Sequence, residues 1–409
     1  MSSASPAAAG TPHFLDQPKA VWATAFACVV GFMSIGLVDP ILVAIARGLD
    51  ATPAQVSLLF TSYFAVTSVM MLVTGFVASR LGGKNTLLLG AALIVVFAGL
   101  AGTSTSIPEL VGYRAGWGLG NAFFVVTALS VIVASSRGGT MAAILMYESA
   151  LGLGISAGPL LGAVLGDMSW RYPFYGTATL MAIGFVAIFL FLGKTPPPAQ
   201  KIGLSDPIRA LNHRGLATVA GSAFFYNYAF FSVLAFVPFV LQMSAYTIGG
   251  IFFGWGVLLA LFSVVVAPKL QSRFSGLKLL TSMLVLLALV LVAIAFGSRE
   301  VVIAAVVLSG AIMGVNNTIY TEMALEISPS PRPVASAGYN FVRWFAGVVA
   351  PFAAPKIAEY AGSTVTFLVA AAAALLAIGV LQARRADLGR FAGPHEEEIV
   401  SEVTASSTP

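Results

Sequence analysis

Charged residues are scarce in this chain. Of its 409 residues only 9% are Asp, Glu, Lys or Arg, against about 25% in an ordinary soluble protein. Hydrophobic residues make up 58%, so a large water-facing surface is excluded. The composition predicts an all-α polytopic membrane protein in a lipid bilayer. The net charge of +5 does not indicate a nucleic-acid partner, because the basic residues fall in short segments between apolar runs.

Cysteine and histidine are also rare. Cys28 is the one cysteine, so no disulfide can form within the chain, and the three histidines lie in polar tails or loops. No cluster of Cys and His with metal-ligand spacing occurs. The phosphate-binding pattern GxxxxGK[ST] is absent, so we do not expect ATP to supply energy. No nucleophile–base pair is evident either. We therefore expect no enzymatic activity, no cofactor and no metal.

Long apolar runs are what the chain has in abundance. Crossing a bilayer takes about 20 apolar residues, and runs of this kind predict twelve membrane-spanning helices near 21–47, 54–79, 86–104, 108–134, 140–166, 172–193, 216–242, 247–269, 278–297, 301–326, 333–359 and 364–383. The first is too long for a cleavable signal peptide, so we expect it to be retained.

The arrangement of these spans predicts two six-helix bundles between polar segments. We expect an N-terminal tail (1–19), a first bundle (20–193), a linker (194–215) with a short amphipathic helix near 206–213, a second bundle (216–384) and a disordered C-terminal tail (385–409).

The distribution of basic residues predicts the orientation. With the N-terminus inside, 15 of the 21 lysines and arginines fall in inner loops or tails and four in outer loops. Arg114 and Arg343 fall within spans. Cytoplasmic loops carry the excess of Lys and Arg, so both ends are predicted to be cytoplasmic, in a multi-pass protein of the cell membrane.

The two halves of the chain resemble each other at a nearly constant offset. Three pairs of segments match at separations of 192 to 196 residues: Ser79–Gly83 with Ser272–Gly276, Gly158-Pro159 with Ala350-Pro351, and Gly118–Asn121 with Gly314–Asn317. A duplicated six-span unit implies two bundles around a central cavity that opens alternately to each side.

The fifth span carries an acid and a glycine stripe. Gly154, Gly158, Gly162 and Gly166 recur every fourth residue, so they share one helix face against which another backbone can pack closely. Pro159 removes a helix hydrogen bond and bends the helix. Together with Glu148 these features favour a moving helix that handles a proton or cation, although the glycines could serve packing alone.

These motifs resemble those of the major facilitator superfamily over residues 20 to 385, in particular its twelve-span drug:proton antiporters. The loop after span two is similar to the superfamily signature, with Gly75, Arg80, Gly82 and Lys84 in place. Ser79 stands where the signature has an acid that helps to latch the bundles, which implies a weaker or different latch. Span four is similar to the Arg-x-x-x-Gly motif at Arg114 and Gly118, with Trp117 in the usual Gln position.

Span five, from Gly154 through Gly158-Pro159 to Gly162, is similar to the antiporter motif. The resemblance implies export rather than import. Asp39-Pro40-Ile41-Leu42 in span one is similar to a Pro-x-Leu pattern of the same antiporters.

Three charges inside the spans are candidates for proton coupling: Asp39, Arg114 and Glu148. At about 1.5 Å of rise per residue, Asp39 and Arg114 lie at similar outward depths. They could form a coupling pair that protonation of Asp39 releases, or a permanent structural ion pair. Glu148 has no basic residue of the first bundle at its depth, which suits a carboxyl that loads and releases a proton. Its repeat counterpart is Asn340.

Aromatic, amide and basic side chains are candidates for the substrate cavity. Those selected are Tyr226, Asn227, Tyr228, Asn121, Asn317, Tyr320, Asn340 and Arg343. Arg343 could pair with Glu148 or bind an anionic part of a substrate. A cavity with many aromatics and one or two acids suits amphipathic, often cationic, compounds.

The sequence thus predicts a proton-coupled exporter of small amphipathic or cationic molecules, and the resemblance implies that it acts as a monomer. Two alternatives stay open: a transporter of one physiological metabolite, and a non-transporting sensor on a transporter fold.

Overall fold

The computed structural model describes residues 16–137, 139–197 and 201–392, and within these ranges the side chains of a few residues, including Asp39 and Glu148, lie outside the description. The first bundle is built from α1 (Lys19–Gly36), α2 (Leu42–Gly48), α3 (Pro53–Leu81), α4 (Gly83–Thr103), α5 (Ile107–Ser135), α6 (Gly139–Met168) and α7 (Tyr172–Phe191). After the linker helix α8 (Asp206–Ala210), the second contains α9 (Arg214–Leu241), α10 (Ala245–Leu261), α11 (Ala267–Gln271), α12 (Gly276–Phe296), α13 (Arg299–Glu326), α14 (Arg332–Ala361) and α15 (Ser363–Ala383).

Twelve helical segments in the described part of the chain are long and apolar enough to cross a membrane, which confirms the predicted spans. Their ends follow local chemistry. Thr52 and Gln55 form a reciprocal capping box at the start of α3, which satisfies amide groups that a helix start leaves without partners. Gly82, at φ 81°, separates α3 from α4, a conformation open to glycine at little cost.

Two of the predicted spans are interrupted. Where the sequence predicts one helix over 21–47, α1 ends at Gly36, and a 3-10 turn at Asp39–Ile41 leads into α2. Pro40 disfavours the helical conformation of the residue before it, so Asp39 sits at a break in the span. The predicted depth of Asp39 assumed one continuous helix over 21–47, and this assumption was wrong. The eighth span contains a π-helical turn, Phe262–Val266, before α11.

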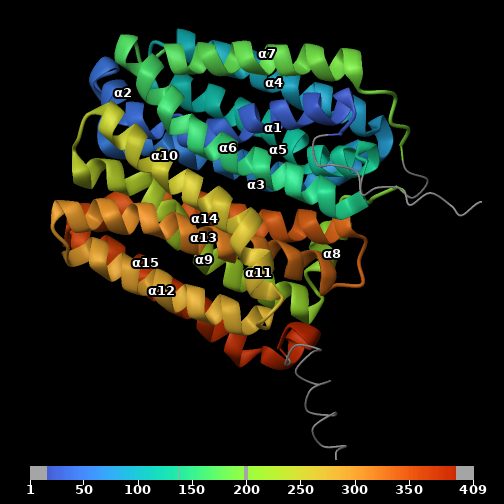
Figure 1. The fold of residues 1–409 in the computed structure, drawn as a ribbon. Coiled ribbons are helices and arrows are strands. Elements are labelled where there is room, and N and C mark those ends of the chain that lie inside the picture. The colour runs from blue at the N-terminus through green and yellow to red at the C-terminus, as the bar shows by residue number, and fades with distance from the viewer. Residues whose placement is uncertain (1–15, 138, 198–200, 393–409) are drawn as a thin grey trace, which may run out of the picture.

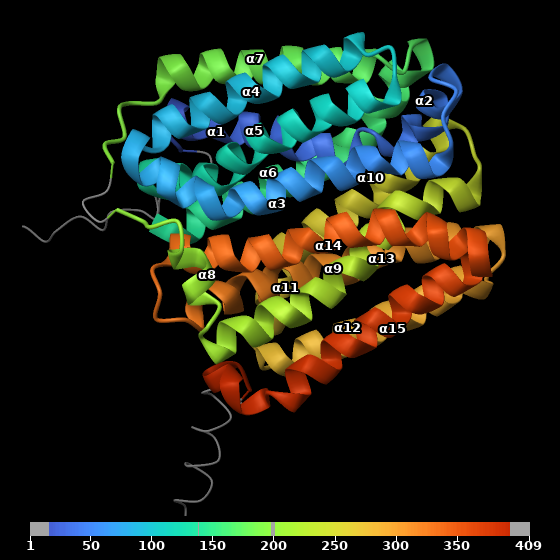
Figure 2. The same cartoon turned by 180° about the vertical axis from the view of Figure 1, so that it is seen from behind.

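The helices form two groups with the linker helix α8 at one end (Figures 1 and 2). Helices α1–α7 make one bundle and α9–α15 the other. The bundles meet mainly along two helix pairs, α3 with α14 and α6 with α10. Each pair joins a helix from the first half to one from the second, so the junction has the two-fold pattern that a repeat predicts.

The packing repeats as well as the sequence. Gly118 of α5 lies so close to the Tyr63 carbonyl of α3 that an added Cβ would clash with it, and Gly314 of α13 stands in the same relation to the Leu259 carbonyl of α10. Both residues of the second pair lie 196 positions after those of the first. The match between Gly118 and Gly314 therefore reflects equivalent close contacts in the two bundles.

The glycine stripe of α6 packs against α1, as its spacing predicts. An ideal Cβ at Gly154 would lie 2.5 Å from the Val29 carbonyl oxygen, and one at Gly158 or Gly162 would clash with the Met33 or Leu37 carbonyl. The opposite face of α6 meets the second bundle, where a Cβ at Gly256 of α10 would lie 2.6 Å from Ser156 Oγ. Helix α6 is thus enclosed between a neighbour in its own bundle and one in the other.

Candidate transport pathway between the bundles

Two small cavities lie at the junction of the bundles. Their volumes are about 60 and 20 Å³, against about 300–1,000 Å³ for ligand pockets. Phe32 of α1, Leu151 of α6, and Asn317, Arg343 and Trp344 of the second bundle line both. A drug-sized compound does not fit here in this conformation, so its binding requires the bundles to move apart.

Four of the predicted cavity residues line these spaces. Asn317 and Arg343 line both cavities, Asn340 the larger one and Asn227 the smaller one. They come from α9, α13 and α14, three helices of the second bundle. The walls from the first bundle are mainly apolar: besides Phe32 and Leu151 they include Val125, Val126, Leu129, Ile35 and Ile155.

The other predicted cavity residues lie elsewhere in the described structure. Tyr226 is buried and its hydroxyl donates to the Met313 carbonyl oxygen (3.0 Å), while the Tyr320 hydroxyl bonds with Ser222 Oγ (2.5 Å). These two tyrosines stack with ring centroids 5.4 Å apart and hold α9 to α13. Tyr228 and Asn121 are also buried. None of the four lines either cavity.

An aromatic contact joins the bundles beside the smaller cavity, which Phe231 and Trp344 line. The ring of Phe64 on α3 lies 4.5 Å from that of Phe231 on α9 and 5.5 Å from that of Trp344 on α14, centroid to centroid. Aromatic pairs at such separations contribute about 0.5–1.5 kcal/mol beyond the area they bury. The sequence does not predict this cluster, because no pattern distinguishes Phe64 from the many phenylalanines that face lipid.

Arg114 is fully buried in the first bundle. Its guanidinium lies over the rings of Tyr63 (4.3 Å) and Trp117 (4.7 Å), and its Nε donates to the Leu59 carbonyl oxygen (3.5 Å). Cation–π contacts of this kind are worth about 2 kcal/mol when desolvated. Trp117, in the position where the related motif has Gln, thus forms part of the wall around the arginine.

The proposed proton carriers cannot be placed beyond their backbones. Asp39 lies in the turn after α1 and Glu148 within α6, but their side chains are outside the described part of the structure. The predicted pairs of Asp39 with Arg114 and of Glu148 with Arg343 stay predictions.

The loop signature after span two holds the linker. Ser79 Oγ accepts a hydrogen bond from the Ile202 amide (3.2 Å), and Arg80 donates to the Ile202 carbonyl oxygen (3.1 Å). The Lys84 amide donates to Thr195 Oγ1 (2.5 Å) and its ammonium group to two carbonyl oxygens at the end of α7. A Cβ added at Gly75 would lie 3.4 Å from the Ile202 side chain, so Ile202 packs next to this face of α3.

The linker then reaches the second bundle. A Cβ at Gly338 of α14 would lie 2.6 Å from the Pro207 carbonyl oxygen of α8, so α8 packs tightly against that helix. Helix α8 lies within the segment predicted to be an amphipathic helix. The role of Thr195, Ile202 and Pro207 was not predicted, because nothing in a polar linker indicates which of its residues will dock.

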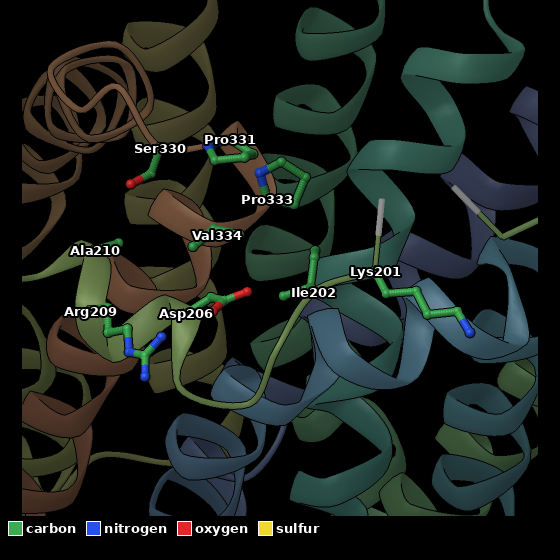
Figure 3. Close-up of a pocket in the computed structure, with 9 residues that line it drawn as sticks. All are labelled: Lys201, Ile202, Asp206, Arg209, Ala210, Ser330, Pro331, Pro333 and Val334. Carbon is green, nitrogen blue, oxygen red and sulfur yellow. The ribbon is translucent and has the colours of Figure 1, made fainter. Parts of the chain in front are cut away.

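A third and larger pocket, of about 420 Å³, lies between the linker and the start of α14 (Figure 3). Ile202, Asp206 and Val334 are among its lining residues, and the Lys201 side chain points away from the rest. This pocket lies at the linker end of the molecule and is separate from the two cavities between the bundles.

The fold and the junction between the bundles define the class of protein. Two six-helix bundles that repeat each other and enclose cavities where they meet are the architecture of secondary transporters. The chain belongs to the Major Facilitator Superfamily, whose family model matches residues 24–351. It is therefore a multi-pass membrane protein.

Known proteins support this assignment. The multidrug efflux protein YfmO of Bacillus subtilis is 47% identical over 383 residues, which cover 93% of this chain and 97% of that protein. A lincomycin resistance protein of Streptomyces lincolnensis is 29% identical over 169 residues, covering 41% of this chain and 35% of that protein. The crystal structure of the human organic anion transporter MFSD10 shares the fold, with a TM-score of 0.71, 17% identity, and coverage of 89% of this chain and 99% of that one.

Proposed function

We propose that the protein exports small amphipathic or cationic compounds by proton-coupled antiport and alternating access. The cavities between the bundles, lined by aromatic, aliphatic and amide side chains of both halves, are the observation that carries this proposal. Surfaces of this composition bind apolar compounds and orient them through a few polar groups. A multidrug efflux protein that matches nearly the whole chain supports the direction and the kind of substrate.

The moving parts are the two bundles, with the limits predicted from the sequence at residues 20–193 and 216–384. Separation of the bundles at one end would enlarge the cavities between them. The α3–α14 and α6–α10 contacts would then be made mainly at the opposite, closed end. The cycle needs a small-molecule substrate, protons and a lipid bilayer. In this proposal it needs no cofactor, metal or nucleic acid, no bond of the substrate is made or broken, and the protein acts as a monomer with cytoplasmic termini.

Glu148 carries the proton in this proposal, and Asp39 with Arg114 contributes to coupling. The position of Glu148 on α6 supports the role, because α6 packs against both its own bundle and α10 of the other. A proton bound there can bias the position of that helix. The repeat places Asn340 in the equivalent position of α14, so this acid is a feature of one half alone.

The test is substrate flux in proteoliposomes under an imposed pH gradient, with a panel of cationic and neutral aromatic compounds. The wild-type protein should transport several of these compounds. Because the proposed mechanism is antiport, protons should move in the opposite direction and change the pH of the lumen. Glu148→Gln should abolish proton movement linked to substrate, while Glu148→Asp should retain part of it. Unchanged proton coupling in Glu148→Gln would remove the assigned carrier, and transport of a single metabolite would favour the first alternative. If no compound is transported, the result would favour the second alternative, a non-transporting sensor on a transporter fold.

A further inference from the structure

We propose that Asn317 is a specificity residue that selects aromatic substrates with an uncharged carboxamide or a similar group, one that presents a hydrogen-bond donor next to an acceptor. This role rests on the proposed export function and deepens it, because it names a group that the small amphipathic substrates carry. Three features of the molecule support it: the place of Asn317 at the cavities between the bundles, its unbonded amide and the aromatic walls around it.

Asn317 faces the cavities between the bundles. It stands on α13, is buried within the molecule and lines both cavities. Its neighbour Asn316 is also buried but lines neither cavity, because adjacent residues of a helix point about 100° apart. Asn121, the counterpart of Asn317 at the offset that aligns Gly118 with Gly314, is buried in the first bundle and lines neither cavity as well. Of these three asparagines, Asn317 is therefore the one placed to meet a substrate.

The polar side chains that share the larger cavity with Asn317 are bonded to one another. Thr321 Oγ1 accepts a hydrogen bond from Arg343 (3.3 Å). Asn340 Nδ2 donates to Ser336 Oγ (3.1 Å). The Asn317 amide differs, because no side-chain or backbone group in the described part of the chain bonds to it. Buried amides are almost always hydrogen-bonded, so we expect this one to bond to what occupies the cavity: water when the pathway is empty, and a substrate group during transport.

An asparagine side chain can bond to two neighbouring groups of a ligand at once. Its Nδ2 carries two donors and its Oδ1 is an acceptor, so a carbonyl next to an N–H matches both. A ligand group that displaces an ordered water without replacing its hydrogen bonds loses affinity. Asn227 lines the smaller cavity together with Asn317, and its Nδ2 donates to the Ala223 carbonyl oxygen (2.8 Å), which leaves Oδ1 as a second acceptor. A primary carboxamide, with one carbonyl and two N–H groups, matches this set.

The other walls of the smaller cavity suit a flat apolar body. Phe231 and Trp344 come from the second bundle and Phe32 from the first. Aromatic rings bury a large area against such a body and add a preference for stacked or edge-to-face contact. A polar group that enters this apolar space without a hydrogen-bond partner costs free energy. The site therefore fits an aromatic compound whose neutral polar group reaches Asn317.

The experiment compares two aromatic compounds of similar shape, 2-naphthamide and 2-acetylnaphthalene, which differ in that the NH2 group of the first is a CH3 group in the second. Binding is measured by thermal stabilisation of the purified protein in detergent. Competition is measured as the concentration that halves transport of a cationic compound into or out of proteoliposomes. The proteins are wild type, Asn317→Leu and the matched control Asn316→Leu, and Asn317→Ala takes the place of Asn317→Leu if that variant does not fold.

The quantity compared is the ratio of the affinity for the amide to the affinity for the ketone. We expect Asn317→Leu to lower this ratio about ten-fold relative to wild type, because hydrogen bonds to the NH2 group are lost, and to change ketone binding less than about two-fold. Asn316→Leu should keep the wild-type ratio. A normal unfolding temperature shows that a variant folds, and a residue with a purely structural role would lower the affinity for both compounds alike.

The outcomes separate this inference from the proposed function. A ratio in Asn317→Leu within two-fold of that in wild type would overturn the inference, and continued transport of the cationic compound would leave export standing. An equal loss of both compounds in Asn317→Leu, or the same fall in the ratio in Asn316→Leu, would also overturn it. A preference for the amide that depends on Asn317, in a protein that transports no compound, would support the inference and contradict export.

Discussion

Single residues set how closely the helices approach one another. In α6 the glycines that face α1 let carbonyl oxygens of that helix lie where a side chain would otherwise be. Association of helices in a membrane gains from such close contact, since lipid provides little hydrophobic force between them. The same helix carries Glu148, so the packing of α1 on α6 supports the backbone of the proposed proton carrier.

We predict that Gly154→Ala destabilises the protein. The new methyl group would lie 2.5 Å from the Val29 carbonyl oxygen and 2.7 Å from the Phe32 Cβ, so α1 and α6 must move apart. Such overpacking costs about 1–3 kcal/mol, which should lower the unfolding temperature measured in detergent. Gly112→Ala in α5 is the matched control, because a Cβ there has nothing within 4 Å. Equal unfolding temperatures for the two variants would contradict the role of the stripe.

The residue scale also shows where sequence reasoning fails. Aromatic and amide residues near 223–231 predict a cavity wall, and Asn227 does line a cavity. Tyr226, one position before it, instead bonds to Met313 within the second bundle. Adjacent residues on a helix point about 100° apart, and in a span with no polar face the pattern does not indicate which of them faces the pathway.

At the scale of elements, the linker connects the two six-helix bundles, which are the two copies of the repeat. Its start is fixed to the first bundle through Ser79, Arg80 and Lys84, and its helix α8 rests on α14 of the second. Ser79 replaces the acid that the superfamily signature has here, and it accepts a hydrogen bond from the linker backbone. The weaker or different latch that the resemblance implies stays a prediction, and the contact observed at Ser79 is with the linker.

We predict that Ser79→Ala loosens the linker. The Ile202 amide would lose its bond to Ser79 Oγ, at a cost of about 1 kcal/mol. Hydrogen exchange at Ile202 and Gly203 should become faster by several-fold, while exchange in the middle of α3 stays the same. Ser272→Ala is the control, because Ser272 occupies the repeat position and bonds only locally, to the Lys269 carbonyl oxygen. Unaltered exchange at Ile202 would show that Ser79 does not hold the linker.

At the scale of the whole molecule, the two described cavities between the bundles are smaller than ligand pockets of about 300–1,000 Å³, so we expect a drug-sized substrate to bind there after the bundles have moved apart. The bundles contact each other mainly along two helix pairs, α3–α14 and α6–α10. An alternating cycle opens one end of this junction as it closes the other. Distances across the two ends should therefore change in opposite directions.

Spin labels can test this movement. We predict that in a Cys28→Ala background, which removes the one native cysteine, Arg137→Cys with Ser272→Cys reports the linker end and Thr105→Cys with Ser244→Cys the other end. A change of pH or addition of a transported compound should lengthen one distance and shorten the other. Labels within one bundle, at Arg137 and Thr105, serve as the control and should keep their distance. Two distances that change in the same direction would contradict rocking of rigid bundles.

The sequence by itself determined the class of protein, the twelve spans, the repeat and the packing role of the glycine stripe. These follow from strong local signals: the length of apolar runs, the spacing of small residues and the constant offset between halves. The tertiary structure decided where span one breaks in space, which polar residues line the cavities and what the loop signature holds. Lipid and the bundle interior are both apolar, so hydrophobic pattern cannot separate the faces of a spanning helix. Only the packing of all the helices together places Arg343 and Leu151 opposite the same space.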